Sequence, residues 1–352
     1  MLYDLARPFI FSLDAEKAHG LTIAGLKALP LGPAPKSDPI LATTLAGLNF
    51  PNPIGMAPGF DKNGEVPDTL IRMGFGFAEV GTLTPLPQPG NPKPRIFRLA
   101  KDKAVINRLG FNNDGQETAA PRLKRMRNRM GNGVLGINIG ANKNSDDRIA
   151  DYVIGVRNMA PLADYLTINI SSPNTPGLRA LQDKGALEEL LAAVMETRDT
   201  VAGSARKVPV FLKVAPDLEP ADIDDIVDVT VKQNIDALIV SNTTITRPSL
   251  RSASKDETGG LSGAPLKDLA LQRLKDFYAV SGGKIPLIGV GGIANADDAY
   301  ERIKAGASLV QLYTAMIYEG PLMVRSMSCG LARLLKRDGF SSVADAVGCA
   351  HK

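Results

Sequence analysis

Histidine and cysteine are scarce in this chain of 352 residues, and tryptophan is absent. The two histidines are His19 and His351, and the two cysteines are Cys329 and Cys349. A metal site rich in histidine or cysteine, or a Ser-His-Asp triad, therefore cannot be assembled from the middle of the chain. We expect a reducing compartment and no metal site. Any chemistry must use Ser, Lys, Asn, Thr or a cofactor.

Long apolar runs and a strong charge of one sign are also missing. No run reaches the ~18 residues that a membrane-spanning helix requires, and the N-terminus does not resemble a signal peptide. The formal net charge is +4, which suits anionic ligands or a lipid surface but is too small to indicate a nucleic-acid partner. With 44% hydrophobic and 22% charged residues, the composition is typical of a soluble globular protein.

Short apolar runs alternate with longer segments of helical spacing. The runs are 54-IGMA-57, 78-AEV-80, 134-VLGINI-139, 165-YLTINI-170, 210-VFLKV-214, 237-ALIVS-241, 286-PLIGV-290 and 308-SLVQLY-313. Helical spacing is clear in residues 185–202, 221–234 and 296–307. Parallel strands need crossovers and are covered on both faces, so this pattern predicts an α/β fold, a (β/α)8 TIM barrel, within residues 41–352. A doubly wound open sheet is the structural alternative.

Polar residues and glycines follow the expected strands at the end where such barrels hold their active sites. The segments are 58-PGFDKNG-64, 81-GTLTP-85, 138-NIGANK-143, 169-NISSPN-174, Lys213, 241-SNTT-244, 291-GG-292 and 313-YT-314. Any one of them alone is typical of a turn or a helix cap. Together they predict an active site at this end of the barrel.

Two lysines and one glycine pair carry the strongest chemical signals. Lys213 lies inside an apolar run, so it must either snorkel outward or point inward to a charged or polar ligand. If Lys62 and Lys213 both point inward, they suit an electron-rich cofactor and an anionic substrate. The segment 289-GVGGIANADDA-299 ends the seventh strand and starts a helix, where barrels commonly hold a phosphate through backbone N–H groups. No GxGxxG motif opens a dinucleotide-binding unit, which favours a phosphate-bearing cofactor in a barrel.

Several long motifs, between about residue 1 and residue 340, resemble those of one enzyme family. They are 59-GFDKNGE-65, 95-RIFRL-99, 105-VINRLGFNNDG-115, 136-GINIG-140, 169-NISSPNTPGLR-179, 242-NTT-244, 259-GGLSGAPL-266, 288-IGVGGI-293 and 306-GASLVQLYTA-315. The family is the quinone-dependent, membrane-associated class (class 2) of dihydroorotate dehydrogenase. The resemblance implies oxidation of (S)-dihydroorotate to orotate in pyrimidine (UMP) biosynthesis, with FMN as hydride acceptor and a membrane quinone as final electron acceptor.

The resemblance also implies binding residues. FMN would contact Gly59, Lys62, Thr82, Asn138, Asn169, Lys213, Ser241, Gly263, Gly292, Tyr313 and Thr314, with its phosphate near the last four. Dihydroorotate would contact Lys62, Asn107, Arg108, Leu109, Gly110, Phe111, Asn169, Asn174, Asn242 and Thr243. Amide side chains suit the cyclic ureide of this substrate because they both donate and accept hydrogen bonds.

Ser172 is the catalytic residue that the resemblance implies. It would take a proton from substrate C5 while a hydride leaves C6 for the flavin. Because a serine alone is a poor base at neutral pH, it needs a proton relay, for which the family implies Thr175 with a water near Phe111. Pro173 and Pro176 are expected to hold the loop rigid. The soluble class of the family uses cysteine as its base, and residues 169–179 contain none, which independently favours the quinone-dependent class.

Residues 1–40 lie outside the eight runs. Apolar residues recur at helical spacing in residues 1–29, with Pro8 as an expected interruption and Asp14 suited to cap a second helix. Two short amphipathic helices either pack on their own domain or rest on a membrane and admit a quinone tail. The resemblance implies the second, with His19 and Arg98 near the quinone head and peripheral association with the cytoplasmic side of the cell inner membrane.

Three alternatives stay open at this point. The chain could be another FMN-dependent barrel oxidoreductase that acts on a different pyrimidine, or a non-catalytic flavin-binding or phosphate-binding module. It could also be a flavin-free barrel, such as a phosphate-sugar lyase, that uses Lys213 to form a Schiff base.

Pro58 stands where the family usually has alanine, and it is therefore left out of the predicted site.

Overall fold

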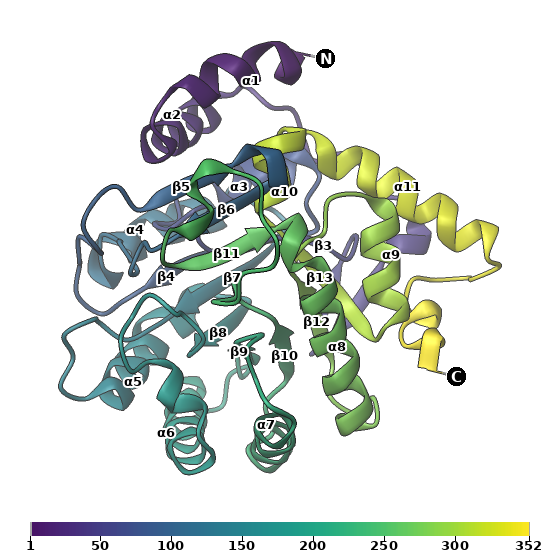
Figure 1. Cartoon of the computed structure of the whole chain (residues 1–352). Helices are drawn as coiled ribbons and strands as arrows, with labels where there is room; N and C mark the ends of the chain where they lie inside the picture. Colours follow the sequence, from purple (N-terminus) through teal and green to yellow (C-terminus); the bar gives the residue numbers. More distant parts are fainter. Residues whose placement is uncertain (1, 352) are drawn as a thin grey trace.

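A closed barrel of eight parallel strands forms the centre of the computed structural model, which describes residues 2–351 (Figure 1). In chain order the strands are β3 (Ile54–Met56), β4 (Phe77–Leu83), β7 (Val134–Ile139), β8 (Tyr165–Asn169), β9 (Val210–Val214), β10 (Ala237–Val240), β12 (Leu287–Val290) and β13 (Ala307–Leu312). Each of the eight predicted runs forms one of these strands. The barrel prediction is confirmed, and the open sheet is excluded because β13 pairs with β3 and closes the ring.

Helices surround the barrel, and all but the last two connect its strands (Figure 1). They are α3 (Pro67–Met73), α4 (Gln116–Arg127), α5 (Arg148–Met159), α6 (Lys184–Ala202), α7 (Pro220–Lys232), α8 (Lys267–Ser281), α9 (Ala296–Lys304), α10 (Thr314–Glu319) and α11 (Met323–Arg337). The three predicted helical segments form α6, α7 and α9. Local sequence sets the start of α7, where Glu219 and Asp222 form a capping box and proline occupies the first helical position.

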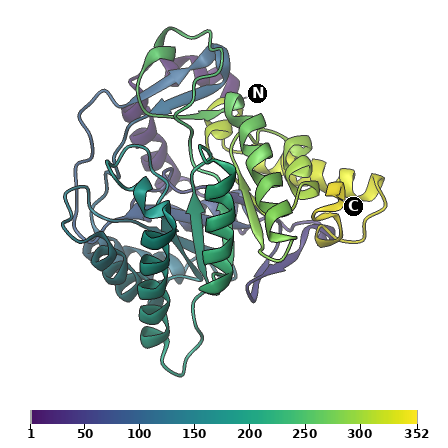
Figure 2. The same ribbon diagram turned by 60° about the horizontal axis from the view of Figure 1, so that its bottom comes forward.

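Aromatic side chains fill the N-terminal half of the barrel. The rings of Tyr165 and Phe211 stack with centroids 4.4 Å apart, and Phe77 packs edge-on against Phe50. Glycine is required beside these rings, because a Cβ at Gly136 would lie 2.2 Å from Cζ of Tyr165. The hairpin of β1 (Thr43–Leu45) and β2 (Leu48–Phe50) belongs to the same apolar cluster and covers this end (Figure 2). The opposite end is therefore left for polar side chains.

A second, three-stranded antiparallel sheet lies above the C-terminal mouth of the barrel (Figure 1). It consists of β5 (Ile96–Leu99), β6 (Ala104–Asn107) and β11 (Gly260–Gly263), with β6 in the centre. It was not predicted from the sequence, since its strands come from two loops far apart in the chain. The sheet adds one wall to the space above the barrel.

The N-terminal helices α1 (Leu2–Ser12) and α2 (Ala15–Ala28) pack outside this sheet (Figure 1). Asp14 caps α2 as predicted, accepting hydrogen bonds from the N–H groups of Glu16 and Lys17. The expected interruption at Pro8 is wrong: α1 continues through it. A proline removes a single backbone hydrogen bond here, while contacts such as that of the Arg7 guanidinium with the Tyr318 carbonyl hold the helix in place. Within residues 2–351, no helix combines the length and apolarity needed to cross a membrane.

Candidate active site

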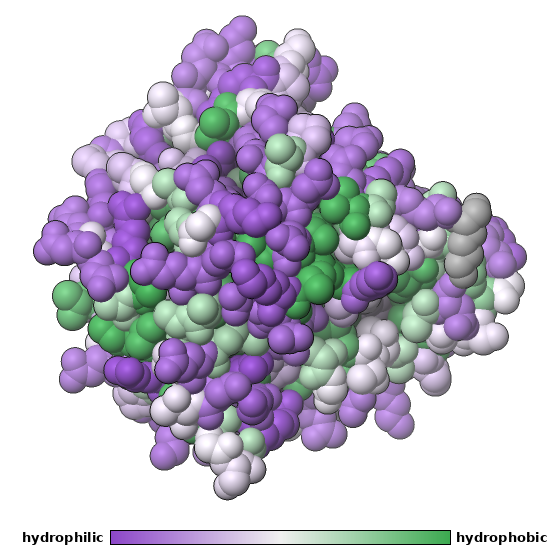
Figure 3. All heavy atoms as spheres, turned by 90° about the horizontal axis from the view of Figure 1, so that it is seen from below, coloured by the Kyte–Doolittle hydropathy of each residue, from purple (hydrophilic) through white to green (hydrophobic). Residues whose placement is uncertain are grey.

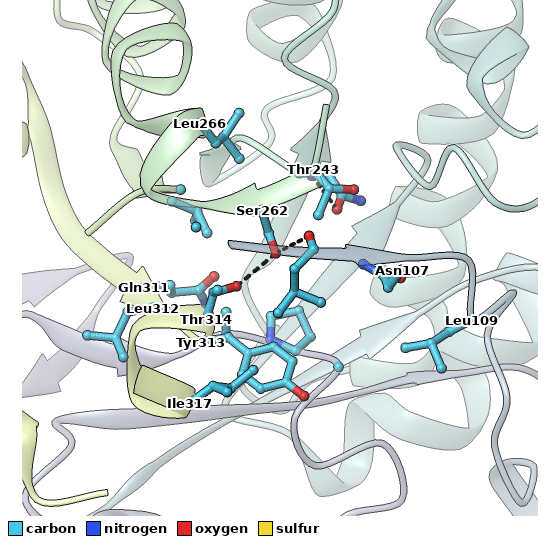
Figure 4. A pocket seen from close by; sticks show the side chains of 18 of the residues that line it. Asn107, Leu109, Thr243, Ser262, Leu266, Gln311, Leu312, Tyr313, Thr314 and Ile317 are labelled. Carbon is cyan, nitrogen blue, oxygen red and sulfur yellow. Dashed lines mark hydrogen bonds between the residues drawn. The ribbon is translucent and has the colours of Figure 1, made fainter. Parts of the chain in front are cut away.

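A pocket opens between the C-terminal ends of the barrel strands and the β5–β6–β11 sheet (Figure 4). It brings together most of the predicted site: Gly59, Lys62, Thr82, Asn107, Leu109, Gly110, Phe111, Asn169, Ser172, Asn174, Lys213, Ser241, Asn242, Thr243, Gly263, Gly292, Tyr313 and Thr314. Pro58 also lines it. Four predicted residues do not line it, namely Asn138, Arg108, His19 and Arg98. Among residues 2–351, no group of three or more His, Cys, Asp or Glu side chains is arranged to hold a metal ion.

Asn138 lies directly behind the pocket wall and orients residues that line it. Its side-chain oxygen accepts hydrogen bonds from Thr82 at 2.6 Å and from Asn169 at 3.1 Å. Its side-chain nitrogen donates to Glu79 at 2.8 Å. Asn138 therefore fixes the amide orientation of Asn169 without facing the pocket itself.

Glu79 is a buried carboxylate inside the barrel that was missed from the sequence. Besides Asn138, it accepts hydrogen bonds from the Tyr165 hydroxyl at 3.0 Å and the Gln311 amide at 2.6 Å. The sequence did contain an indication of this buried charge. Glu79 interrupts the apolar run 78–80 just as Lys213 interrupts the run 210–214. The carboxylate places a fixed negative charge beneath the pocket.

Lys213 points inward, which settles the choice left open by its sequence. Its side chain is 5% exposed and lines the pocket. Burial lowers the pKa of Lys213, and the nearby carboxylate of Glu79 counteracts part of this shift. A buried ammonium that faces an open pocket is suited to an electron-rich ligand.

Lys62 and His19 form a contact at the edge of the pocket. The Nζ atom of Lys62 lies 3.1 Å from Nε2 of His19, and the other ring nitrogen of His19 lies 3.4 Å from the Tyr313 hydroxyl. Burial is the main cause that lowers the pKa of His19 to about 3 and that of Lys62 to about 8. At neutral pH the lysine is therefore the donor, so that the proton of the neutral imidazole resides on Nδ1.

The loop that carries Ser172 is held from several sides. Arg179 donates to the carbonyl of Ser171 at 3.2 Å, and Arg148 donates to the carbonyl of Pro176 at 2.6 Å. Ser172 is 5% exposed, and its hydroxyl accepts a hydrogen bond from the N–H of Asn174. The two arginines hold the loop on either side of the serine, and the Ser172 hydroxyl itself is bound by a backbone N–H.

Amide side chains form the wall beside Ser172. The side chain of Asn174 donates to that of Asn107 at 3.3 Å, and Asn242 donates to the hydroxyl of Ser171 at 3.0 Å. In Figure 4, Asn107 and Thr243 face the same space. The wall thus offers both donors and acceptors to a ligand.

Arg108, predicted to bind substrate, and Arg98, predicted near the quinone head, do not line this pocket. Arg108 pairs with Glu257 at 2.7 Å and stacks over the ring of Phe97, outside the pocket. Arg98 donates to the backbone carbonyls at the end of α1, including that of Ile10 at 3.0 Å. The positions of these side chains could not be predicted because their partners lie far away in sequence.

The far end of the pocket is built from the loops after β12 and β13 together with β11. The hydroxyl of Thr314 donates to that of Ser262 at 2.8 Å (Figure 4). Gly292 has a positive φ of 70°, and a Cβ there would lie 2.4 Å from Cα of Lys267. Glycine is therefore needed for the close approach of the two loops. Ser262 and Gln311 were missed as pocket residues, although both lie within quoted motifs.

Comparisons with known proteins agree with one another. Residues 40–335 match the family described as dihydroorotate dehydrogenase. The chain is 62% identical over 348 residues to the dihydroorotate dehydrogenase (quinone) of Erythrobacter litoralis, with 99% of each chain covered. It is 60% identical over 349 residues to that of Novosphingobium aromaticivorans, covering 98% of this chain and 99% of the relative. A solved structure of DHODH from Eimeria tenella in complex with ferulenol superposes with a TM-score of 0.92 at 44% identity, and 96% of each chain is covered.

Proposed function

The chain belongs to the dihydroorotate dehydrogenase family, in its quinone-dependent group, and from this premise we propose that it oxidises (S)-dihydroorotate with FMN as hydride acceptor and a membrane quinone as final electron acceptor. The product is orotate, and the step serves pyrimidine biosynthesis. The observation that carries the proposal is the placement of Ser172, Lys62 and an amide wall in the same pocket as the buried Lys213.

The pocket residues fit FMN. Among the described side chains, no carboxylate lies within ion-pair distance of the buried Lys213 ammonium, so its positive charge is available to a ring that gains negative charge on reduction. A Cβ on Gly59 would meet nothing within 4 Å, so its backbone borders open space in the pocket. When bound, FMN supplies the hydride-accepting ring. Residues proposed to hold it are Gly59, Lys62, Thr82, Asn169, Lys213, Ser241, Gly263, Gly292, Tyr313 and Thr314, with Asn138 acting from behind.

Dihydroorotate is proposed to bind between Lys62 and the amide wall. The ammonium of Lys62 suits the substrate carboxylate, and Asn107, Asn174 and Asn242 suit its ureide. The oxygen of Ser172 takes the C5 proton while its own hydroxyl proton leaves through a relay. The hydroxyl of Thr175 is buried and has no hydrogen-bond partner among the described residues. Such a hydroxyl is free to pass a proton through a water. This observation supports a proton relay through Thr175.

Residues 1–40 are proposed as the quinone-binding and membrane-binding extension, and residues 41–352 as the catalytic domain. Large apolar side chains are exposed on α1 and α2, with Leu5 at 73%, Phe9 at 77% and Leu21 at 61%. The face seen from the opposite side mixes hydrophilic residues with several apolar areas (Figure 3). The exposed apolar side chains of the two helices support peripheral binding through them, on the cytoplasmic side of the inner membrane, with His19 and Arg98 near the quinone head.

The test is an anaerobic titration of the purified protein followed by its visible spectrum. Dihydroorotate is expected to bleach a flavin band, and a short-chain quinone is expected to restore it. Dihydrouracil is the control substrate and should leave the band unchanged. A colourless protein that takes up no FMN would refute the proposal, and bleaching without reoxidation by quinone would refute the role given to residues 1–40.

A further inference from the structure

Arg302 is the bulkiest fully buried side chain among the described residues, with 1% of its surface exposed. It extends from α9 behind the loop that follows β12. Its Nη2 atom donates hydrogen bonds to the carbonyl of Gly291 at 2.8 Å and to that of Lys267 at 2.6 Å. Gly291 lines the pocket, and Lys267 follows the pocket residue Leu266. One guanidinium nitrogen thus joins the two loops that meet at the far end of the pocket.

This guanidinium has no anionic partner of its own. Among residues 2–351, no carboxylate lies within ion-pair distance of Arg302, and its Nε and Nη1 atoms make no hydrogen bond. The nearby Asp298 and Glu301 instead bind the ammonium of Lys267, at 2.7 Å and 3.3 Å. Burial lowers the pKa of Arg302 to about 10, so it stays protonated at neutral pH. Glu301, Asp298 and Asp268 attract this charge from beyond ion-pair distance, and an anionic ligand at the far end of the pocket would stabilise it further.

The hydrogen bond to Gly291 also fixes a backbone direction. The peptide between Gly291 and Gly292 is trans, so its C=O and N–H point in opposite directions. Because the carbonyl is turned toward Arg302, the N–H of Gly292 points away from Arg302, and Gly292 lines the pocket. The positive φ of 110° at Gly291 lets the chain adopt this turn.

We propose that Arg302 is a positioning residue for the phosphate of FMN. It holds the peptide N–H of Gly292 toward the phosphate and places a positive charge behind the loop. The charge acts through buried protein, where screening by water is weak. The inference rests on the proposed FMN cofactor and adds a residue that does not itself touch the pocket.

The test compares FMN with riboflavin, which lacks the phosphate. The full chain is stripped of flavin and titrated with each compound, and binding is followed by quenching of flavin fluorescence. Arg302→Met is expected to raise the Kd for FMN about tenfold, the change that about 1.4 kcal/mol produces, and to leave the Kd for riboflavin unchanged. Arg302→Lys keeps the charge and should recover most of the FMN affinity.

Arg273→Met is the matched control, because Arg273 also binds a backbone carbonyl, that of Leu218 at 2.6 Å, but outside the pocket. It should leave the ratio of the two Kd values unchanged. If Arg302→Met does not fold, Arg302→Gln and Arg302→Lys are compared, since both are able to bind the carbonyls and only one is charged. An equal loss of FMN and riboflavin affinity, or no loss of either, would overturn the role of Arg302. A wild-type chain that binds neither flavin would refute the FMN proposal itself.

Discussion

The Nζ atom of Lys62 lies 3.1 Å from Nε2 of His19, although 43 residues separate the two in the chain. Lys62 belongs to the loop after the first barrel strand, and His19 belongs to α2. The contact therefore joins the N-terminal helices to the pocket. Because burial holds the pKa of Lys62 at about 8, this ammonium loses its proton at a pH that is accessible to kinetics.

We expect kcat/KM for dihydroorotate to fall as the pH rises above about 8. A lysine with a lowered pKa is charged below that pKa and neutral above it, and only the ammonium attracts the substrate carboxylate. The pH dependence of kcat/KM reports the pKa of the free enzyme. The Lys62→Arg variant should lose the break near pH 8, because a guanidinium stays protonated. A wild-type profile without a break between pH 7 and 10 would contradict the role of Lys62.

Ser172→Ala is expected to keep FMN and to lose most dihydroorotate oxidation at neutral pH, on the order of the 10²–10⁴-fold that a positioned base contributes. Flavin content by absorbance and the rate of anaerobic flavin bleaching are the two measurements. Thr200→Val, on the exposed surface of α6, serves as a control and should change neither. Near-normal bleaching in Ser172→Ala would remove the serine from the mechanism.

The sequence predicted the barrel because its signals are local. Each strand is a short apolar run and several helices are longer amphipathic segments, so periodicity located the eight strands and the helices α6, α7 and α9. The pocket could be predicted because parallel strands bring their carboxyl ends together. Other features depend on tertiary partners that lie far away in sequence. They are the β5–β6–β11 sheet, the outward direction of Arg108, and the contacts of Arg98 and Arg302 with backbone carbonyls. The periodicity of apolar residues cannot predict such contacts. At Pro8, packing also overrides a local signal that would normally end a helix.

Lys213→Ala should weaken flavin retention and flavin reduction together. Its ammonium is the positive charge that offsets Glu79 beneath the pocket, so its loss leaves a buried carboxylate that opposes the negative charge of a reduced flavin. The measurements are the FMN content of the purified protein and its reduction potential, which should become more negative. Lys184→Ala is the matched control, because this lysine is 46% exposed and pairs with Asp225 on the surface. Unchanged content and potential in Lys213→Ala would contradict the proposal.

Arg95 joins α2 to the loop that leads into β5, and its removal should release the N-terminal helices. It makes two hydrogen bonds to Glu16, at 2.9 and 2.6 Å, and donates to the carbonyls of Pro89 and Asn91 at 2.6 and 2.8 Å, while only 6% exposed. A hydrogen bond between charged groups contributes about 1.5–3 kcal/mol to stability, and this pair is only partly buried. Arg95→Met is therefore expected to speed hydrogen exchange in residues 2–28 and to slow quinone reduction, but not reduction of a soluble dye.

The same ion pair predicts a pH dependence of the N-terminal helices. Arg95 lowers the pKa of Glu16 from its ordinary value of 4.5. A carboxyl group whose pKa is lower in the folded than in the unfolded protein stabilises the folded state fully at a pH above its unfolded pKa. This stabilisation is lost as the pH falls through the folded pKa. Exchange protection in α2 should therefore decline below pH 4.5 in the wild type and be insensitive to that range in Glu16→Gln. Lys27→Met removes the exposed pair with Glu65 and should change protection little. Equal pH profiles in the wild type and Glu16→Gln would show that this pair does not hold the helices.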